Sequence, residues 1–120
     1  VVVNAPSLAI TKTITPSQVV DNDRVTYTFV ISNTGNTAVE LADNAVITDI
    51  FDPALSALTV TFNGTAWTAG TQYTYDEATG TFATVAGNIS VPAATFTQNP
   101  TTGVYTATPG LSTLVVTGTI

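Results

Sequence analysis

Val25-Thr26-Tyr27-Thr28-Phe29-Val30-Ile31 is the stretch from which the fold of this chain can be worked out. Large apolar side chains occupy its odd positions, and threonine or valine occupies its even positions. Because successive side chains of a β-strand point to opposite faces, this alternation predicts a strand with one buried face. Asn33-Thr34-Gly35-Asn36 follows. Since glycine tolerates positive φ, we expect Gly35 to close a turn that reverses the chain.

The composition extends this prediction to the rest of the chain. Thr occurs 26 times and Val 15 times among 120 residues, so more than a third of the side chains are β-branched. Such side chains pack well on pleated strands and are less favoured in helices. No stretch has a sustained helical period with caps. We therefore expect an all-β chain with little or no helix.

Turn signals recur about every ten residues and separate the expected strands. Asn63-Gly64 is the strongest short hairpin signal, and the loops 76–80 and 99–103 both end in Thr-Gly. The last expected strand has apolar residues at both parities, which predicts a central strand covered on both faces. This spacing predicts one domain over residues 1–120, a two-sheet sandwich with Greek-key connections, in which residues 1–7 are a linker. The expected strands are 8–14, 25–31, 45–51, 58–62, 65–68, 72–75, 81–85, 94–97, 104–108 and 111–120.

The residue types that are missing limit the possible chemistry. The chain has no Cys, His or Met, which removes disulfides, thiol nucleophiles and histidine acid–base catalysis. We therefore expect no enzyme activity, no catalytic residue, no cofactor and no metal site. Asp21, Asn22, Asp23 and Asp43 offer oxygen ligands to calcium, but their spacing matches no calcium motif, and we expect solvated turns.

The charge balance limits the possible partners. Eight acidic residues face only Lys12 and Arg24, which gives a net charge of −6. Nucleic acids and anionic membranes attract clustered cations, so we expect neither as a partner. No basic region precedes the apolar residues at the start of the sequence, so we expect no signal peptide there. No apolar run is long enough to span a bilayer.

Lys12 is the only lysine, and its position is unusual. In the expected strand 8–14 it shares one parity with Leu8, Ile10 and Ile14, so its ammonium points to an apolar face. An unpaired charge is costly there. Lys12 therefore needs a charge partner, a changed ionisation state or a covalent bond.

Asp49 has the same unusual position on another expected strand. Its parity matches that of Ile47 and Phe51, so its carboxylate also points to an apolar face. We favour a salt bridge between Lys12 and Asp49 that fixes the register of the sheets.

Three groups of motifs carry a family resemblance. They are Leu8-Ala9-Ile10-Thr11-Lys12-Thr13, the stretch 25–36 with its Tyr-Thr and Asn-Thr-Gly, and Val46-Ile47-Thr48-Asp49. In this order they resemble the DUF11 conserved-repeat domain of bacterial, chiefly Gram-positive, cell-surface proteins. The match covers about the first half of the chain, and the second half is similar in a less diagnostic way.

The resemblance implies an immunoglobulin-like sandwich repeated in tandem. It also implies an alternative for Lys12, because related surface and pilin domains carry an intramolecular isopeptide bond from a first-strand lysine to Asn or Asp. Asp49 is then either the target or the assisting acid, Glu40 is a weaker choice of acid, and Asn33 is the remaining amide target. The final strand, where pilin-type domains often hold the target, has no Asn or Asp.

The expected function follows from these points. We expect a structural spacer or stalk repeat that transmits force in a tandem array outside the cell, at the bacterial surface or cell wall. Its partners are neighbouring repeats, and the isolated domain is a monomer. The alternative is an adhesive module that binds a host glycan or protein through a platform of Trp67, Tyr73 and Tyr75, although we expect these aromatic residues to be core.

Overall fold

The strand expected around Tyr27 is the middle of the main sheet. In the computed structural model, which describes residues 5–20 and 22–120, this strand is β2 (Arg24–Asn33). It pairs antiparallel with β1 (Leu8–Thr15) along one edge and with β10 (Gly110–Thr119) along the other. Its alternate residues from Val25 to Asn33 are buried, as the sequence predicts.

The main sheet has five strands in the order β1-β2-β10-β4-β5. β4 (Ser56–Phe62) pairs with the far edge of β10, and the short β5 (Thr65–Ala66) ends the sheet. The last strand of the chain thus lies between the second and the fourth. This crossing is why strands that are neighbours in the sequence are not always neighbours in the sheet.

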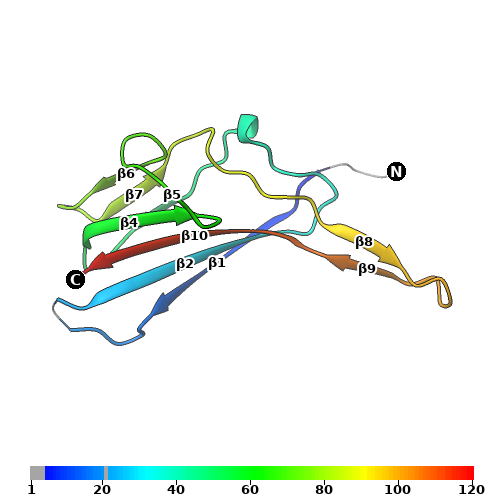
Figure 1. Ribbon diagram of the computed structural model, residues 1–120, viewed down its shortest axis with the longest axis horizontal. Coiled ribbons are helices and arrows are strands. Elements are labelled where there is room, and N and C mark those ends of the chain that lie inside the picture. Colours follow the sequence, from blue (N-terminus) through cyan, green and yellow to red (C-terminus); the bar gives the residue numbers. More distant parts are fainter. Residues whose placement is uncertain (1–4, 21) are drawn as a thin grey trace.

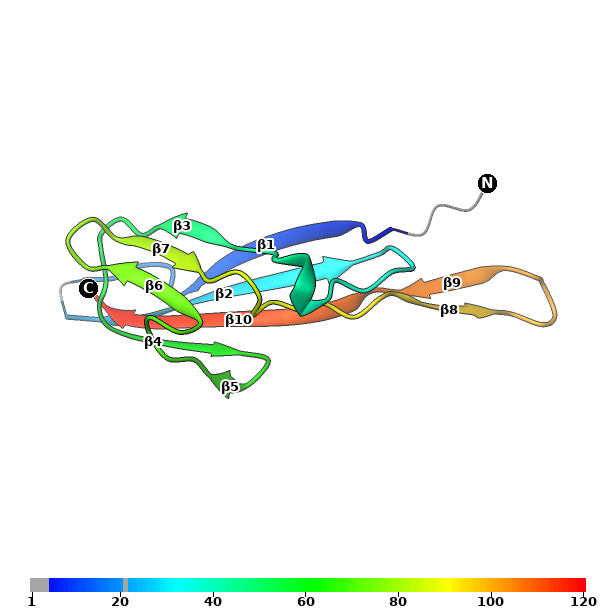
Figure 2. The ribbon, with the colours of Figure 1, turned by 90° about the horizontal axis from the view of Figure 1, so that it is seen from above.

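A smaller sheet lies over one part of the main sheet (Figures 1 and 2). Its order is β3-β7-β6, with β3 (Thr48–Ile50), β7 (Thr81–Thr84) and β6 (Tyr73–Asp76). Apolar side chains of both sheets, and of the loops that connect their strands, form one core. The fully buried ones among them are Val25, Phe51, Leu55, Val60, Phe82, Ile89, Val91, Leu114 and Val116.

The chain is all-β, and its antiparallel sheets form an immunoglobulin-like sandwich, which confirms the expected fold class. One 3₁₀ turn, η1 (Leu41–Asp43), interrupts the strands. A third pair of strands, β8 (Thr95–Gln98) and β9 (Tyr105–Thr108), forms a hairpin that projects beyond the sandwich (Figure 1). This projection contributes to the elongated shape of 57 × 31 × 22 Å.

The three hairpins expected from turn residues are all present. Asn63 and Gly64 have φ of 49° and 81°, the two positive values that a type I′ turn requires. Gly35 differs from its expectation, because its φ is not positive. A Cβ at this position would lie 2.2 Å from the carbonyl oxygen of Ala5, so the glycine is required by the close approach of another segment.

Two predictions about strand environment are wrong. β10 is central, but only one of its faces is buried, and Leu111 on the other face is exposed. β1 directs Leu8, Ile10 and Ile14 to the core side of the sheet, yet all three are exposed. The physical reason is that β1 is an edge strand, which the smaller sheet covers incompletely: Asp49 of β3 reaches Lys12, but the aliphatic residues of β1 stay partly in solvent.

The buried and exposed leucines of β10 provide a matched test of the core. Leu114 is fully buried, whereas Leu111 on the same strand is 56% exposed. We expect Leu114→Ala to lower the free energy of unfolding by about 2–5 kcal/mol, because it leaves a cavity. Leu111→Ala is expected to change it by less than about 1 kcal/mol. Urea denaturation of both variants measures this difference, and equal losses would contradict the assignment of the core.

Candidate functional site

Lys12 and Asp49 meet between the two sheets. Lys12 lies in the middle of β1 opposite Phe29 of β2, and Asp49 lies in β3 opposite Phe82 of β7. Lys12 Nζ is 2.5 Å from Asp49 Oδ2. The parity of each side chain in its own strand brings the two charges together, and their contact joins the edge of one sheet to the edge of the other.

Aromatic rings surround the ammonium group of Lys12. Its Nζ lies 4.8 Å from the ring centroid of Tyr27, 5.6 Å from that of Phe51 and 5.9 Å from that of Phe29. A cation over the faces of aromatic rings is attracted by their quadrupoles. Tyr27 and Phe51 also stack on each other at 4.7 Å. Lys12 therefore lies at the margin of the aromatic core and keeps part of its side chain in water.

The carboxylate of Asp49 depends on Lys12. Its Oδ1 accepts a hydrogen bond from the backbone N–H of Ile50 at 2.8 Å. Its Oδ2 is shielded from solvent and accepts no hydrogen bond from any described group. Its charge partner is Lys12, whose ammonium lies against Oδ2. Without Lys12, this oxygen would have no charge partner, although the Asp49 side chain keeps 21% of its surface exposed.

Asn33 is not brought to Lys12. The register places it opposite Leu8, four residues along β2 from Phe29, which is opposite Lys12. At about 3.4 Å per residue, this separation is roughly 14 Å. Glu40 is exposed at the start of η1, where its N–H donates to Asp43, and the described residues show no ion pair for its side chain.

The fully buried Asn33 instead binds three segments together. Its Oδ1 accepts hydrogen bonds from the N–H groups of Ser7 and Gly35, at 3.0 and 2.9 Å. Its Nδ2 donates to the carbonyl groups of Thr37 and Pro92, at 2.8 and 3.2 Å. Both the carbonyl oxygen and the amino group of the side chain are used. The bonds to Gly35 and Thr37 lie within the turn after β2, whereas those to Ser7 and Pro92 join distant segments. The sequence placed Asn33 on the buried face of β2 but did not predict this role, because Ser7 and Pro92 are distant along the chain.

The segment before β1 is held at this end of the main sheet, which we call the incoming end. The carbonyl oxygen of Ser7 accepts a hydrogen bond from Thr34 N–H at 2.9 Å, in addition to the bond from Ser7 N–H to Asn33. The N–H of Ala5 donates to Asn36 Oδ1. Of the linker expected over residues 1–7, residues 1–4 lie outside the described residues, and residues 5–7 lie against the sandwich.

The end of β10 is held at the opposite end of the sheet, which we call the outgoing end. Ile120 accepts a hydrogen bond from Asn22 N–H and donates one to the carbonyl of Asp23, both at 2.9 Å. Because β1 and β10 both run antiparallel to β2, they are parallel to each other. The chain therefore joins the sheet at one end through β1 and leaves it at the other through β10.

The aromatic residues considered for sugar binding are packing residues. Tyr73 is buried against Phe82, and Trp67 stacks on Phe62 with ring centroids 5.0 Å apart. The hydroxyl of Tyr75 accepts from the N–H of Leu55 and donates to its carbonyl, both at 2.7 Å. Burial raises the pKa of the Tyr73 and Tyr75 hydroxyls above the usual value. These side chains do not form an open stacking platform.

The calcium alternative is not supported in the described part of the chain. Asp21 lies outside the described residues. Asp23 accepts a hydrogen bond from Val20 N–H, and Asp43 accepts one from Glu40 N–H. Elsewhere among the described residues, no group of acidic side chains is arranged to hold a metal ion.

An apolar groove of about 180 Å³ runs beside the first half of β1. No titratable side chain lines it, so it offers dispersion contacts but no acid–base or nucleophilic chemistry. Its lining residues are Leu8, Ala9, Ile10, Ile31, Val39, Ala45, Val46, Ile47, Ile89 and Val91.

Comparisons with known proteins add no family to these observations. No family model matches the chain, and neither a curated protein nor a solved structure matches it significantly. The described residues include no helix long and apolar enough to cross a membrane.

The ion pair predicts the mass of the purified protein. We expect intact-mass spectrometry to give the mass calculated from the sequence, because we favour an ion pair between Lys12 and Asp49 over a covalent bond. A mass lower by one water, restored by Lys12→Ala, would instead establish a covalent Lys12–Asp49 amide. A double-mutant cycle with Lys12→Met and Asp49→Asn then measures the ionic coupling, which we expect to be roughly 1 kcal/mol for this partly exposed pair.

The hydrogen bonds of Asn33 predict a large loss of stability on truncation. Asn33→Ala is expected to lower the free energy of unfolding by about 2–4 kcal/mol, because it leaves the buried partners of the amide unpaired. Asn99→Ala is the matched control, since Asn99 makes its hydrogen bonds in an exposed turn. If both variants unfold at the same urea concentration, Asn33 does not have this role.

Proposed function

We propose that this chain is a structural spacer or stalk repeat of a large bacterial cell-surface protein, and that it transmits force along a tandem array outside the cell. The observation that carries the proposal is the direction in which the chain passes through the main sheet. β1 begins at the incoming end, β10 finishes at the outgoing end, and both pair with β2 (Figure 1).

This topology places the hydrogen bonds under shear when the two ends of the domain are pulled apart. The tension then runs along the strands, whereas antiparallel ladder bonds are perpendicular to them. All the bonds between β1 and β2, or between β2 and β10, must therefore be loaded together before one strand slides past the other. A domain in which the bonds broke one after another would resist much less.

The held ends and the ion pair support the same function. Asn33 and Thr34 bind Ser7 where tension would arrive, and Asn22 and Asp23 bind Ile120 where it would leave. Lys12 and Asp49 tie the edge strand β1 to the smaller sheet. An isopeptide bond at Lys12 would serve the same purpose with a covalent link.

The sequence motifs support the proposed location. Lys12-Thr13, Asn33-Thr34-Gly35 and Thr48-Asp49 occur in the order typical of the DUF11 repeat, which we propose as the family. A chain with no cysteine and few charges is also compatible with an exposed protein that is stable without disulfides. Its partners are then the neighbouring repeats of the same protein.

Single-molecule pulling in two directions tests the proposal. With handles at the two termini, we expect unfolding at a force several-fold higher than with one handle at the N-terminus and the other at Leu111→Cys. Leu111 is exposed and lies at the incoming end of β10, so the second geometry pulls the strands apart sideways. The chain has no native cysteine, so the handle attaches at one position.

Equal forces in the two directions would contradict the proposed function. An adhesive module would differ in another way: it would bind a member of a glycan or host-protein panel while showing a low unfolding force through its termini. The fluorescence of Trp67, the only tryptophan, reports both unfolding and any nearby binding.

A further inference from the structure

The β8–β9 hairpin projects from the sandwich without a partner. It extends from the incoming end of the main sheet, and no other described strand pairs with it (Figures 1 and 2). Every residue of both strands is exposed. An isolated two-stranded hairpin is marginally stable in water. A projecting hairpin of this kind gains stability from a surface that covers one of its faces.

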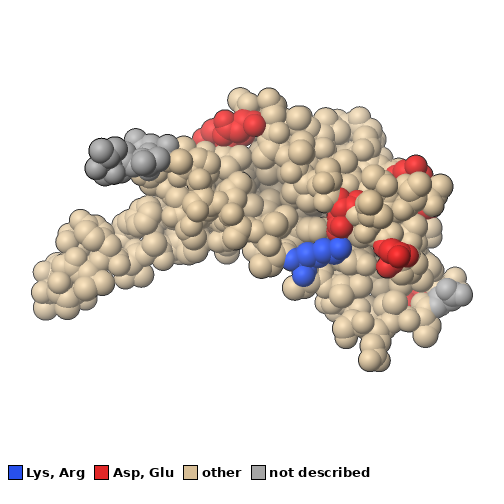
Figure 3. Space-filling view, turned by 180° about the vertical axis from the view of Figure 1, so that it is seen from behind, with Lys and Arg blue, Asp and Glu red and all other residues tan. Residues whose placement is uncertain are grey.

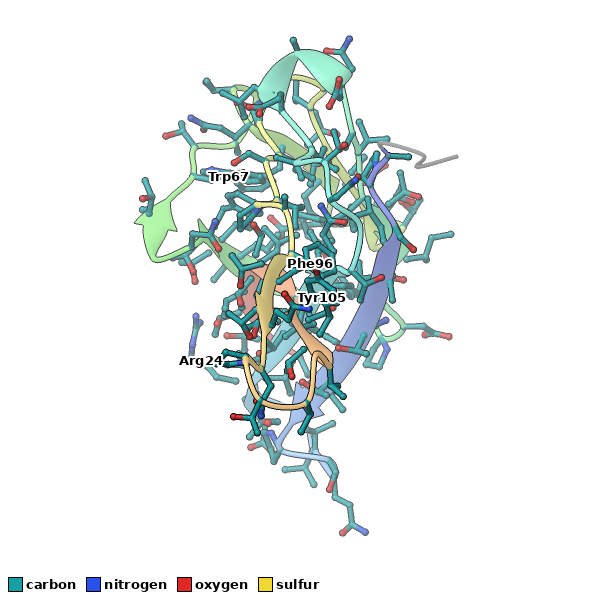
Figure 4. The ribbon with its side chains drawn as sticks, turned by 90° about the vertical axis from the view of Figure 1, so that its right-hand side faces the viewer. Arg24, Trp67, Phe96 and Tyr105 are labelled. Carbon is teal, nitrogen blue, oxygen red and sulfur yellow. The ribbon has the colours of Figure 1, made fainter. Side chains whose placement is uncertain are left out.

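One face of the hairpin is aromatic. The register pairs Phe96 with Ala107 and Gln98 with Tyr105, and the residues of each pair lie on the same face. Phe96 is 50% exposed and Tyr105 is 68% exposed. The two are diagonal neighbours across the strands and lie together when the hairpin is viewed end on (Figure 4). The opposite face consists of threonines in both strands: Thr95, Thr97, Thr106 and Thr108.

We propose that this aromatic face binds the outgoing end of the preceding copy of the same chain in a tandem array. The inference rests on the proposed function and names the contact between repeats. Ser7 is bound to Asn33 near the base of the hairpin, because Asn33 is also opposite Gly110 and bonded to Pro92. A chain segment that leads into Ser7 thus arrives at the end of the sandwich from which the hairpin projects. A preceding copy would have its outgoing end there.

The outgoing end offers an apolar contact. Val20 is 71% exposed in the loop between β1 and β2. Its carbonyl accepts a hydrogen bond from Asp23, which in turn binds the N–H of Ile120. Val20 therefore lies close to the point at which the chain leaves the domain. The buried centre of a protein interface is often rich in aromatic side chains, which pack against apolar residues of the partner.

The charges of the two surfaces are compatible. Residues 95–108 contain no charged side chain, and the hairpin is uniformly uncharged in Figure 3. Asp23 and Arg24 lie at the outgoing end, beside Ile120 and Thr119, so this surface carries charges of both signs. The uncharged hairpin can cover Val20 without desolvating an unpaired charge of its own. The contact is heterologous, since different surfaces of each copy meet, and it repeats along an open array.

Cysteine cross-linking in a chain of two directly joined copies tests the contact. We introduce Val20→Cys in the first copy and Gln98→Cys, on the aromatic face, in the second. The native sequence contains no cysteine that could compete. A disulfide requires the two Cα atoms to approach within about 7 Å. Under mild oxidation, we expect a disulfide within one chain, detected by the mass of the linked tryptic peptides.

The opposite face of the hairpin provides the matched control. Thr97→Cys is one residue away along β8 but points to the threonine face, so with Val20→Cys it is expected to give little cross-link. Adding Phe96→Ser and Tyr105→Ser to the second copy is expected to abolish the Gln98 cross-link. Because these residues lie outside the core, the midpoint temperature of thermal unfolding of each single copy is expected to stay unchanged.

Three outcomes would overturn the inference: equal cross-linking from both faces, no cross-linking from either face, or survival of the Gln98 cross-link after both aromatic residues are replaced. Binding of a glycan or host protein that is lost on Phe96→Ser would also overturn it, because the hairpin would then be a ligand site. The force measurement on a single copy separates these failures from failure of the spacer function, since it requires no contact between copies.

Discussion

The structure depends on the two-sided pairing of β2. Its hydrogen-bonding groups are used along both edges, by β1 on one side and β10 on the other. Its inward residues supply part of the core, and Asn33 at its end binds three separate segments. The first and last strands of the domain are therefore coupled through one strand that both of them share. In the function that we propose, this coupling sets the direction in which the domain resists tension, because β1 enters the sheet at one end and β10 leaves it at the other.

The scarcity of charge makes each charged group in the interior important. Lys12 and Asp49 belong to strands of different sheets, and neither has another strong charge partner in the described part of the chain. The surrounding rings of Tyr27 and Phe51 stabilise the ammonium but contribute no hydrogen bond. Such a pair specifies how the two sheets are aligned more than it adds to stability, because desolvation offsets much of the Coulombic attraction. The sandwich thus has an ionic connection at its β1 margin, where Leu8, Ile10 and Ile14 are exposed.

Alternation and turn residues were sufficient to predict most of the strands. The alternation around Tyr27 predicted β2 and its buried face, and Asn63-Gly64 predicted the hairpin of β4 and β5. Alternation also placed Lys12 and Asp49 on apolar faces, which is why their meeting could be expected from local sequence. It failed for Asn33, whose four partners come from segments up to 59 residues away. It also failed for Gly35, because the close approach of Ala5 is a tertiary contact.

The sequence by itself determined the all-β class, the positions of the strands and the parity of each side chain, because these follow from backbone geometry within a few residues. Only the tertiary structure decided that β1 is an exposed edge, that β10 is inserted beside β2 and that β8 and β9 project from the sandwich. These features depend on which strands pair and on how far one sheet extends over the other. Local side-chain preferences do not encode strand pairing or the overlap of the sheets, since a half-buried strand has the same alternation at the edge of a sheet as at its centre.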